Sequence, residues 1–197
     1  VLGNRFLMCV VKLWLLRWFL GRILMKRFQV WSRRKKIKGR RVFLDVGAYD
    51  GDSLALAMRY LNDVDRFFAI EPGSLQFAKL QKRFGVDQRV TLMKVAAANE
   101  TSTGVKLFHG ERYAHEGDSL LGEKHNARRD SYELVNTLDL AEFIQTGFSD
   151  DDDIILKCDA EGMEYDLLEK MIRDGSIAKV SKLYCEWHAD RTGVSRK

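Results

Sequence analysis

The sequence has 197 residues, 46% hydrophobic and 31% charged, which suits one globular domain with a sizeable core. Its net charge of +5 conceals an asymmetry: residues 1–41 hold thirteen Lys and Arg and no acidic residue, whereas residues 42–197 carry 20 basic and 28 acidic side chains. The three cysteines form no C-x-x-C pair and no Cys/His pairs stand at ligand spacing, so we expect free thiols and no metal site.

Residues 1–41 are predicted to form a basic amphipathic helical arm that precedes the domain. Residues 5–31 are very apolar, but Lys12 and Arg17 interrupt the run of about 20 apolar residues that a membrane-spanning helix needs. At about 100° per residue, most of the basic side chains share one broad face, which is typical of a helix lying in a membrane interface. The basic run 32–41 would then contact anionic lipid.

Three other roles for the arm stay open: packing on a partner or on the domain, a short signal-anchor, and contact with nucleic acid. The large apolar share makes nucleic acid the weakest of them. No small-residue cleavage site precedes the basic run, which argues against a cleaved signal peptide. We therefore expect a cytoplasmic protein that lies at the periphery of an anionic membrane through residues 5–41.

From residue 42 onward, apolar strand-like runs alternate with amphipathic helical runs. The predicted strands are 42–46, 66–71, 90–97, 153–159 and 182–188, with a short extra strand at 105–109. The predicted helices are 52–63, 74–85, 138–145 and 164–175. The polar stretch 110–136 is expected to be an irregular substrate loop. This order predicts an α/β fold, with a mostly parallel sheet and helices on both faces.

The segment FLDVGAYDGDS follows the start of the first strand and predicts a ligand site. Gly47 lets the backbone come close to a ligand, and Gly51 lets the turn enter the helix tightly. The G-x-x-x-G spacing differs from the G-x-G-x-x-G of dinucleotide folds and from the phosphate-binding P-loop. Asp45 and Asp50 would repel a pyrophosphate, so they suit a ligand with a positive centre.

Glu71 lies 20 residues after Gly51, at the tip of the second strand, where a carboxylate can accept hydrogen bonds from both ribose hydroxyls. S-adenosylmethionine is a nucleoside that carries a positive charge instead of phosphates, and we predict it as the cofactor. Asp159, Glu186 and His188 lie at the ends of the later strands. Because ligands bind at the carboxyl ends of parallel strands, these side chains are expected at the same edge.

Four segments, FLDVGAYDGDS, FFAIEP, LKCDAEGMEYDLLEKMI and LYCEWH, together resemble the FkbM-like S-adenosylmethionine-dependent methyltransferases. The most specific part is a D-x-E-G-x-E segment, formed here by Asp159, Glu161, Gly162 and Glu164. The resemblance covers residues 42–188 and leaves out the arm. It implies a Rossmann-like methyltransferase fold and transfer of a methyl group, typically to a hydroxyl oxygen of a small-molecule or sugar-like acceptor.

The resemblance also implies roles for individual residues. Asp45, Gly47 and Gly51 would hold the methionine part of the cofactor, and Glu71 the ribose. The expected cofactor site is completed by Ala48, Asp50, Ala97 and Asp159. Asp159 would face both the methyl donor and the acceptor.

A hydroxyl acceptor must lose a proton, and the candidates for the base are Asp159, Glu161 and His188. His188 has the most suitable unperturbed pKa, although it could instead only bind a neighbouring loop. Glu161 and Glu164 could equally stabilise the start of the following helix.

Methyltransferase sheets of this kind have two further strands, so we expect the sheet of the 42–197 domain to be truncated after its fifth strand. Three rival functions differ in the sequence features that they require. The glycine spacing disfavours a dinucleotide-dependent oxidoreductase. No N/D-P-P-Y/F segment supports a nucleic-acid methyltransferase. A non-catalytic membrane- or partner-binding module with a degenerate nucleotide site stays open.

Overall fold

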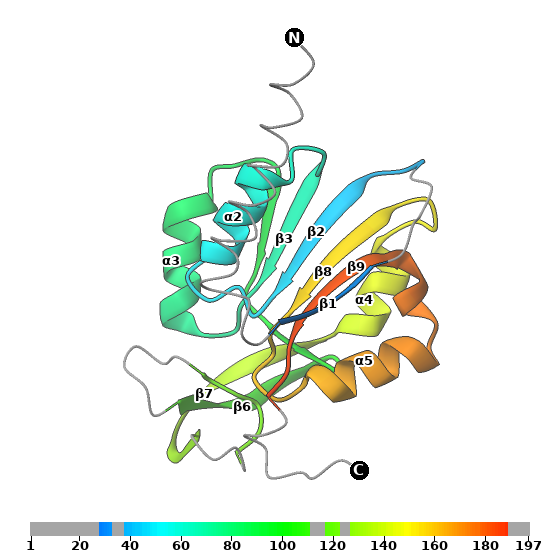
Figure 1. Ribbon diagram of the computed structural model, residues 1–197. Helices are drawn as coiled ribbons and strands as arrows, with labels where there is room; N and C mark the ends of the chain where they lie inside the picture. The colour runs from blue at the N-terminus through cyan, green and yellow to red at the C-terminus, as the bar shows by residue number, and fades with distance from the viewer. Residues whose placement is uncertain (1–27, 33–37, 111–116, 123–126, 189–197) are drawn as a thin grey trace.

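The fold is built on a six-stranded sheet with the strand order β1-β9-β8-β2-β3-β4 (Figure 1). The computed structural model describes residues 28–32, 38–110, 117–122 and 127–188. Five strands of the sheet run parallel to one another, which confirms the predicted α/β class. They are β2 (Arg41–Val46), β3 (Arg66–Ile70), β4 (Val90–Met93), β8 (Asp153–Cys158) and β9 (Val180–Glu186).

Helices cover both faces of this sheet, as the alternating sequence pattern predicts (Figure 1). One face carries α2 (Asp52–Tyr60) and α3 (Ser74–Phe84). The other face carries α4 (Leu140–Gly147) and α5 (Glu164–Arg173), and the 3-10 helix η2 (Ser176–Lys179) joins α5 to β9.

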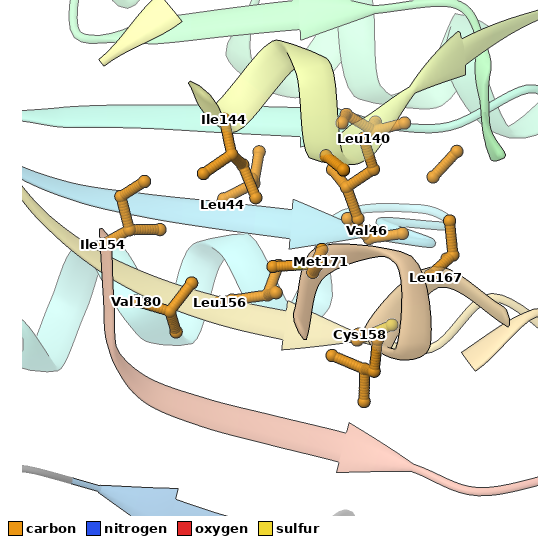
Figure 2. Packing of buried hydrophobic residues seen from close by; sticks show 14 of the residues in the cluster. Leu44, Val46, Leu140, Ile144, Ile154, Leu156, Cys158, Leu167, Met171 and Val180 are labelled. Carbon is orange, nitrogen blue, oxygen red and sulfur yellow. The ribbon is translucent and has the colours of Figure 1, made fainter. Parts of the chain in front are cut away.

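Strand β2 shows why a sheet covered on both faces needs a continuous apolar run. Leu44 and Val46 point into one buried cluster, where they meet Ile144 of α4 and Leu167 of α5 (Figure 2). Phe43 belongs to the second cluster, which includes buried side chains of α2 and α3. Because these apolar side chains fix the strand on both faces, the polar residues at its carboxyl end have a defined position.

A second sheet of three strands, in the order β5-β7-β6, corrects two of the predictions. It contains β5 (Ala96–Ala98), β6 (Ser102–Gly110) and β7 (Ala127–Asp139). The strand predicted over 90–97 is two strands in different sheets. The loop predicted over 110–136 is wrong from residue 127 onward, because β7 exposes one face and therefore carries many polar side chains.

The arm is also corrected where the structure describes it. Residues Phe28–Ser32 form strand β1 rather than a helix, and β1 pairs antiparallel with β9. This pairing satisfies backbone groups at an edge of the parallel sheet. The other residues of the predicted helix lie outside the described residues, so the membrane-bound arm stays a prediction. Within the described part of the chain, no helix is long and apolar enough to span a bilayer.

Candidate functional site

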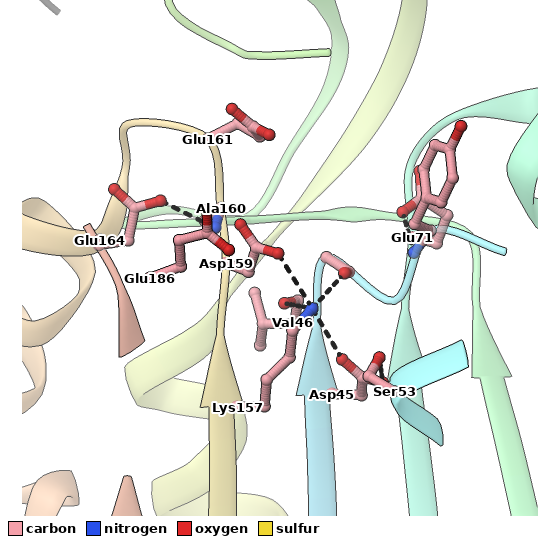
Figure 3. Close-up of polar contacts among 12 residues, drawn as sticks. Asp45, Val46, Ser53, Glu71, Lys157, Asp159, Ala160, Glu161, Glu164 and Glu186 are labelled. Atoms are coloured by element: carbon pink, nitrogen blue, oxygen red, sulfur yellow. Dashed lines mark hydrogen bonds and ion pairs between the residues drawn. The ribbon is translucent and has the colours of Figure 1, made fainter. Parts of the chain in front are cut away.

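Acidic side chains from four strands meet at the carboxyl edge of the large sheet (Figure 3). Asp45 lies near the end of β2, Glu71 follows β3, Asp159 follows β8, and Glu186 ends β9. Parallel strands bring their carboxyl ends to one edge, so residues distant in sequence become neighbours. The structure thus brings together the strand-end acids that the sequence singled out.

Lys157 of β8 is the cation at the centre of this edge, and the sequence analysis missed it. Its side chain is only 8% exposed, and its Nζ lies 3.2 Å from Oδ1 of Asp45 and 3.3 Å from Oδ2 of Asp159. Lys157 also donates a hydrogen bond to the backbone oxygen of Gly47. Burial alone would lower the pKa of Lys157, but the carboxylates of Asp45 and Asp159 outweigh it and raise the pKa above its ordinary value.

A signal for Lys157 was present in the sequence. It interrupts an otherwise apolar strand two residues before Asp159, and a lysine is rarely buried without an acidic partner. The pairing joins the turn after β2 to the turn after β8. Asp45 is held from its other side as well, because Ser53 of α2 donates a 2.6 Å hydrogen bond to its Oδ2.

The two glycines of the first turn have different structural roles. Gly47 has φ +72°, and a Cβ placed on it would lie 1.9 Å from the backbone oxygen of Asp159. Gly51 has φ +90°, and a Cβ there would press on Leu80 and Phe84 of α3. Gly47 therefore permits the close approach of two turns of the site, whereas Gly51 permits tight packing of helix α3 against the start of α2.

Four backbone N–H groups of this turn are already hydrogen-bonded inside the protein. Those of Gly47 and Ala48 donate to the oxygen of Ile70, at 3.0 and 3.1 Å. That of Tyr49 donates to Oε2 of Glu71 at 2.8 Å, and that of Gly51 donates to the oxygen of Ala48. A phosphate-binding turn needs N–H groups that point at the ligand, so this turn is poorly suited to a pyrophosphate.

Glu71 is buried, and its two carboxylate oxygens accept hydrogen bonds from the backbone of Tyr49 and Gly73. Burial raises the pKa of Glu71 to about 7, although these two hydrogen bonds act in the opposite direction. The carboxylate therefore has a fixed orientation at the tip of β3, where a ribose was predicted.

The other predicted cofactor residues lie around this turn or in the core. Ala48 is buried in the cluster beneath α2 and α3. Ala97 of β5 is buried in the cluster beneath α4 and α5. Asp50 forms an ion pair with Arg83 of α3, with an N···O distance of 3.7 Å. Contact of any of these residues with a cofactor stays a prediction.

His188, two residues past β9, organises the other half of the site. Its Nδ1 lies 2.8 Å from Oε1 of Glu164, which is fully buried and also accepts hydrogen bonds from the backbone of Ala160 and Gly162. Glu164 therefore anchors the turn before α5, as well as the imidazole. This anchoring is one of the alternatives that the sequence left open.

The position of His188 disfavours it as a base. Its Nε2 lies 3.5 Å from Oε1 of Glu186 and 3.6 Å from Oε2 of Glu161. Burial alone would lower the pKa of His188, but hydrogen bonds to Glu164 and Glu186 and the charge of Glu161 raise it to about 10. The imidazole is then a cation at neutral pH and has no free lone pair for a substrate proton.

Asp159 lies between the two cations, Lys157 and His188. Burial raises the pKa of Asp159 to about 6, with Lys157 acting in the opposite direction. Glu161 is next to it and has φ +50°, and its backbone oxygen accepts a 2.7 Å hydrogen bond from Ser119. The 117–122 segment is thus attached to the turn after β8, a contact that sequence spacing does not predict.

Comparison with known proteins identifies the family. The model of the methyltransferase FkbM domain matches residues 45–194, about three quarters of the chain. The chain belongs to the FkbM methyltransferase domain family. The resemblance found in its four sequence segments is thereby confirmed.

The chain also matches the crystal structure of a methyltransferase FkbM from Methylobacillus flagellatus KT, with 20% sequence identity and a TM-score of 0.43. The similarity covers 72% of this chain and 31% of that chain, so this chain spans about a third of the length of that protein. No curated protein matches the sequence.

Proposed function

We propose that this FkbM-family domain transfers a methyl group from S-adenosylmethionine to a hydroxyl oxygen of a small-molecule or sugar-like acceptor. The observation that carries the proposal is the chemistry of the strand edge. The buried carboxylates of Asp45 and Glu71 and the partly exposed one of Asp159 lie around a turn in which four N–H groups are internally bonded. Such an edge favours a cofactor with a positive centre and no phosphates.

The residues present fit this cofactor. Oδ1 of Asp159 is buried and accepts no hydrogen bond from the described residues, and Oδ1 of Asp45 is buried with Nζ of Lys157 3.2 Å away. Asp45 and Gly47 would hold the methionine part, and Glu71 would accept hydrogen bonds from the ribose. The bound cofactor would supply an electrophilic methyl group on its sulfonium sulfur.

The acceptor hydroxyl must be positioned and must lose its proton as the oxygen–methyl bond forms and the sulfur–methyl bond breaks. Asp159 and Glu161 are the carboxylates that face this part of the site, with side chains 23% and 22% exposed. One of them accepts the proton, while His188 holds the neighbouring groups in place. Positioning the acceptor oxygen against the methyl carbon supplies much of the rate acceleration in methyl transfer.

Binding of the cofactor is the direct test. Calorimetric titration of S-adenosylmethionine and S-adenosylhomocysteine into the chain is expected to show micromolar binding. Asp45→Asn and Glu71→Gln keep the side-chain shapes and should each weaken it by more than about tenfold. Asp87→Asn is the matched control, because Asp87 precedes β4 at the opposite edge of the sheet.

Two results would refute the assignment. One is a folded chain that binds a dinucleotide such as NAD in preference to S-adenosylmethionine. The other is unchanged binding by both Asp45→Asn and Glu71→Gln, which would place the cofactor elsewhere. Transfer to hydroxyl-bearing acceptors is then followed with a methyl-labelled donor, since the label reports the atom that is methylated.

A further inference from the structure

Three carboxylates, two just after β8 and one at the end of β9, converge on one ring nitrogen, Nε2 of His188. This atom lies 3.5 Å from Oε1 of Glu186, 3.6 Å from Oε2 of Glu161 and 3.9 Å from Oδ1 of Asp159. These distances are longer than a usual hydrogen bond of about 2.9 Å. They are ion-pair distances, so without a metal ion the three carboxylates surround the charged imidazole.

The same distances match the spacing of ligands around one metal ion. Ligand atoms at about 2.1–2.3 Å from an ion lie about 3–4.5 Å from one another. One ligand atom each of Asp159, Glu161 and His188 lies within 4.8 Å of the other two. Each of the three carboxylates is partly exposed, so an ion and a substrate can reach them.

Two further observations point to a ligand at this place. The Nδ1 atom of His188 is bound to the fully buried Glu164, and a carboxylate on the far nitrogen is the usual support of a metal-binding histidine. The contact with Glu164 directs Nε2 of the imidazole, which is 98% buried, toward the three carboxylates. In addition, Oδ1 of Asp159 is buried and accepts no hydrogen bond within the described residues.

We propose that Asp159, Glu161, Glu186 and His188 bind a divalent metal ion. One imidazole nitrogen with carboxylate oxygens suits Mn²⁺ better than Ca²⁺ or Mg²⁺, which prefer oxygen ligands alone. The ion replaces the proton that His188 carries in its absence. The sequence placed these residues at one edge of the sheet, but no metal site was expected, because the spacing of the four residues matches no known metal-binding motif.

The role of the ion rests on the proposed function, although its binding does not. Asp159 belongs both to this cluster and to the Lys157 pairing beside the turn after β2. With the ion bound, Asp159 and Glu161 are its ligands, so an acceptor hydroxyl bound to the ion would lose its proton to water instead of to one of them. Its oxygen would then form the bond to the methyl carbon, and the electron pair of the broken carbon–sulfur bond would stay on sulfur.

A second cluster, His109, Asp118 and Glu133, provides a control site. Its ligand atoms also lie within 4.8 Å of one another. There, however, the ring nitrogen of His109 lies 3.0 Å from Asp118, and both oxygens of Glu133 accept hydrogen bonds from Ser74. Because Ser74 outside the cluster holds Glu133, a change of Glu133 serves as the control for the proposed site.

The test is titration of Mn²⁺ into the full chain without methyl donor, followed by the electron paramagnetic resonance signal of free Mn²⁺. We expect one ion per chain with micromolar affinity. Glu161→Gln and Glu186→Gln, which change partly exposed side chains, should each weaken binding more than about tenfold. Glu133→Gln should leave it unchanged.

No Mn²⁺ binding by the folded chain up to millimolar concentration would overturn the inference, as would binding that is lost only in Glu133→Gln. Titration of S-adenosylmethionine in the absence of metal separates the two proposals. A chain that binds the cofactor but no ion refutes the metal site alone. A chain that binds the ion but no cofactor refutes the proposed function alone.

Discussion

Replacing Gly47 by alanine tests the close approach on which the site is built. A Cβ at this position would lie 1.9 Å from the backbone oxygen of Asp159, so the two turns must separate by more than about 1 Å to reach an ordinary contact. The left-handed conformation at φ +72° adds about 1–2 kcal/mol for a residue other than glycine. Overpacking typically costs about 1–3 kcal/mol more.

Gly104 is the matched control, because its φ is +70° and a Cβ there meets nothing within 4 Å. We expect Gly104→Ala to lower the free energy of unfolding by about 1–2 kcal/mol and Gly47→Ala by about 2–5 kcal/mol. Urea unfolding followed by circular dichroism measures both. Calorimetry should show that only Gly47→Ala weakens S-adenosylmethionine binding. Equal destabilisation by the two variants, with binding unaffected, would refute the reasoning.

Three further predictions concern the buried charges. Lys157→Met leaves Asp45 and Asp159 without their shared cation and should lower the free energy of unfolding, measured with urea, by about 3–5 kcal/mol. Lys82→Met, at an exposed position of α3, is the control and should have little effect. Similar urea midpoints for the two variants would contradict the pairing. Because the pKa of Glu71 is raised from 4.5 to about 7, the folded state holds this proton more tightly and stability falls as pH rises through this window. In Glu71→Gln the free energy of unfolding should fall by about 3 kcal/mol less over the same pH range. Parallel curves of unfolding free energy against pH for the two proteins would disprove this prediction. Glu164→Gln deprives His188 of its charged partner and should cost about 1–3 kcal/mol by thermal unfolding; an unchanged melting temperature would show that the contact is not needed for stability.

The sequence predicted the parallel strands well because each is an apolar run buried on both faces. The run before Asp45 is an example, since Leu44 and Phe43 are buried against opposite layers. The position of the strand-end acids followed from the same pattern. Once parallel strands are recognised, side chains such as Asp45, Glu71 and Asp159 have to lie at one edge.

Other features depend on contacts that local patterns do not encode. Strand β1 reads as part of an apolar helix, but its backbone pairs with β9, more than 140 residues away. Strand β7 reads as a loop because much of its surface is exposed, with Leu134 63% and Tyr132 44% exposed. His188 was a candidate base because of its unperturbed pKa. Its charge in the folded chain is instead set by three glutamates that only folding brings close to it.

The strand order also sets when the site can be completed as the chain leaves the ribosome. Strands β2, β3 and β4 follow one another in the sequence and position Asp45 and Glu71. Only short chain segments separate these strands, so their pairing costs little loop-closure entropy. The pairings β2–β8 and β1–β9 join residues about 110 and 150 positions apart, and such contacts form late. Asp45 and Glu71 are therefore positioned first, and the part of the edge with His188 is added only after β8 and β9 have been synthesised.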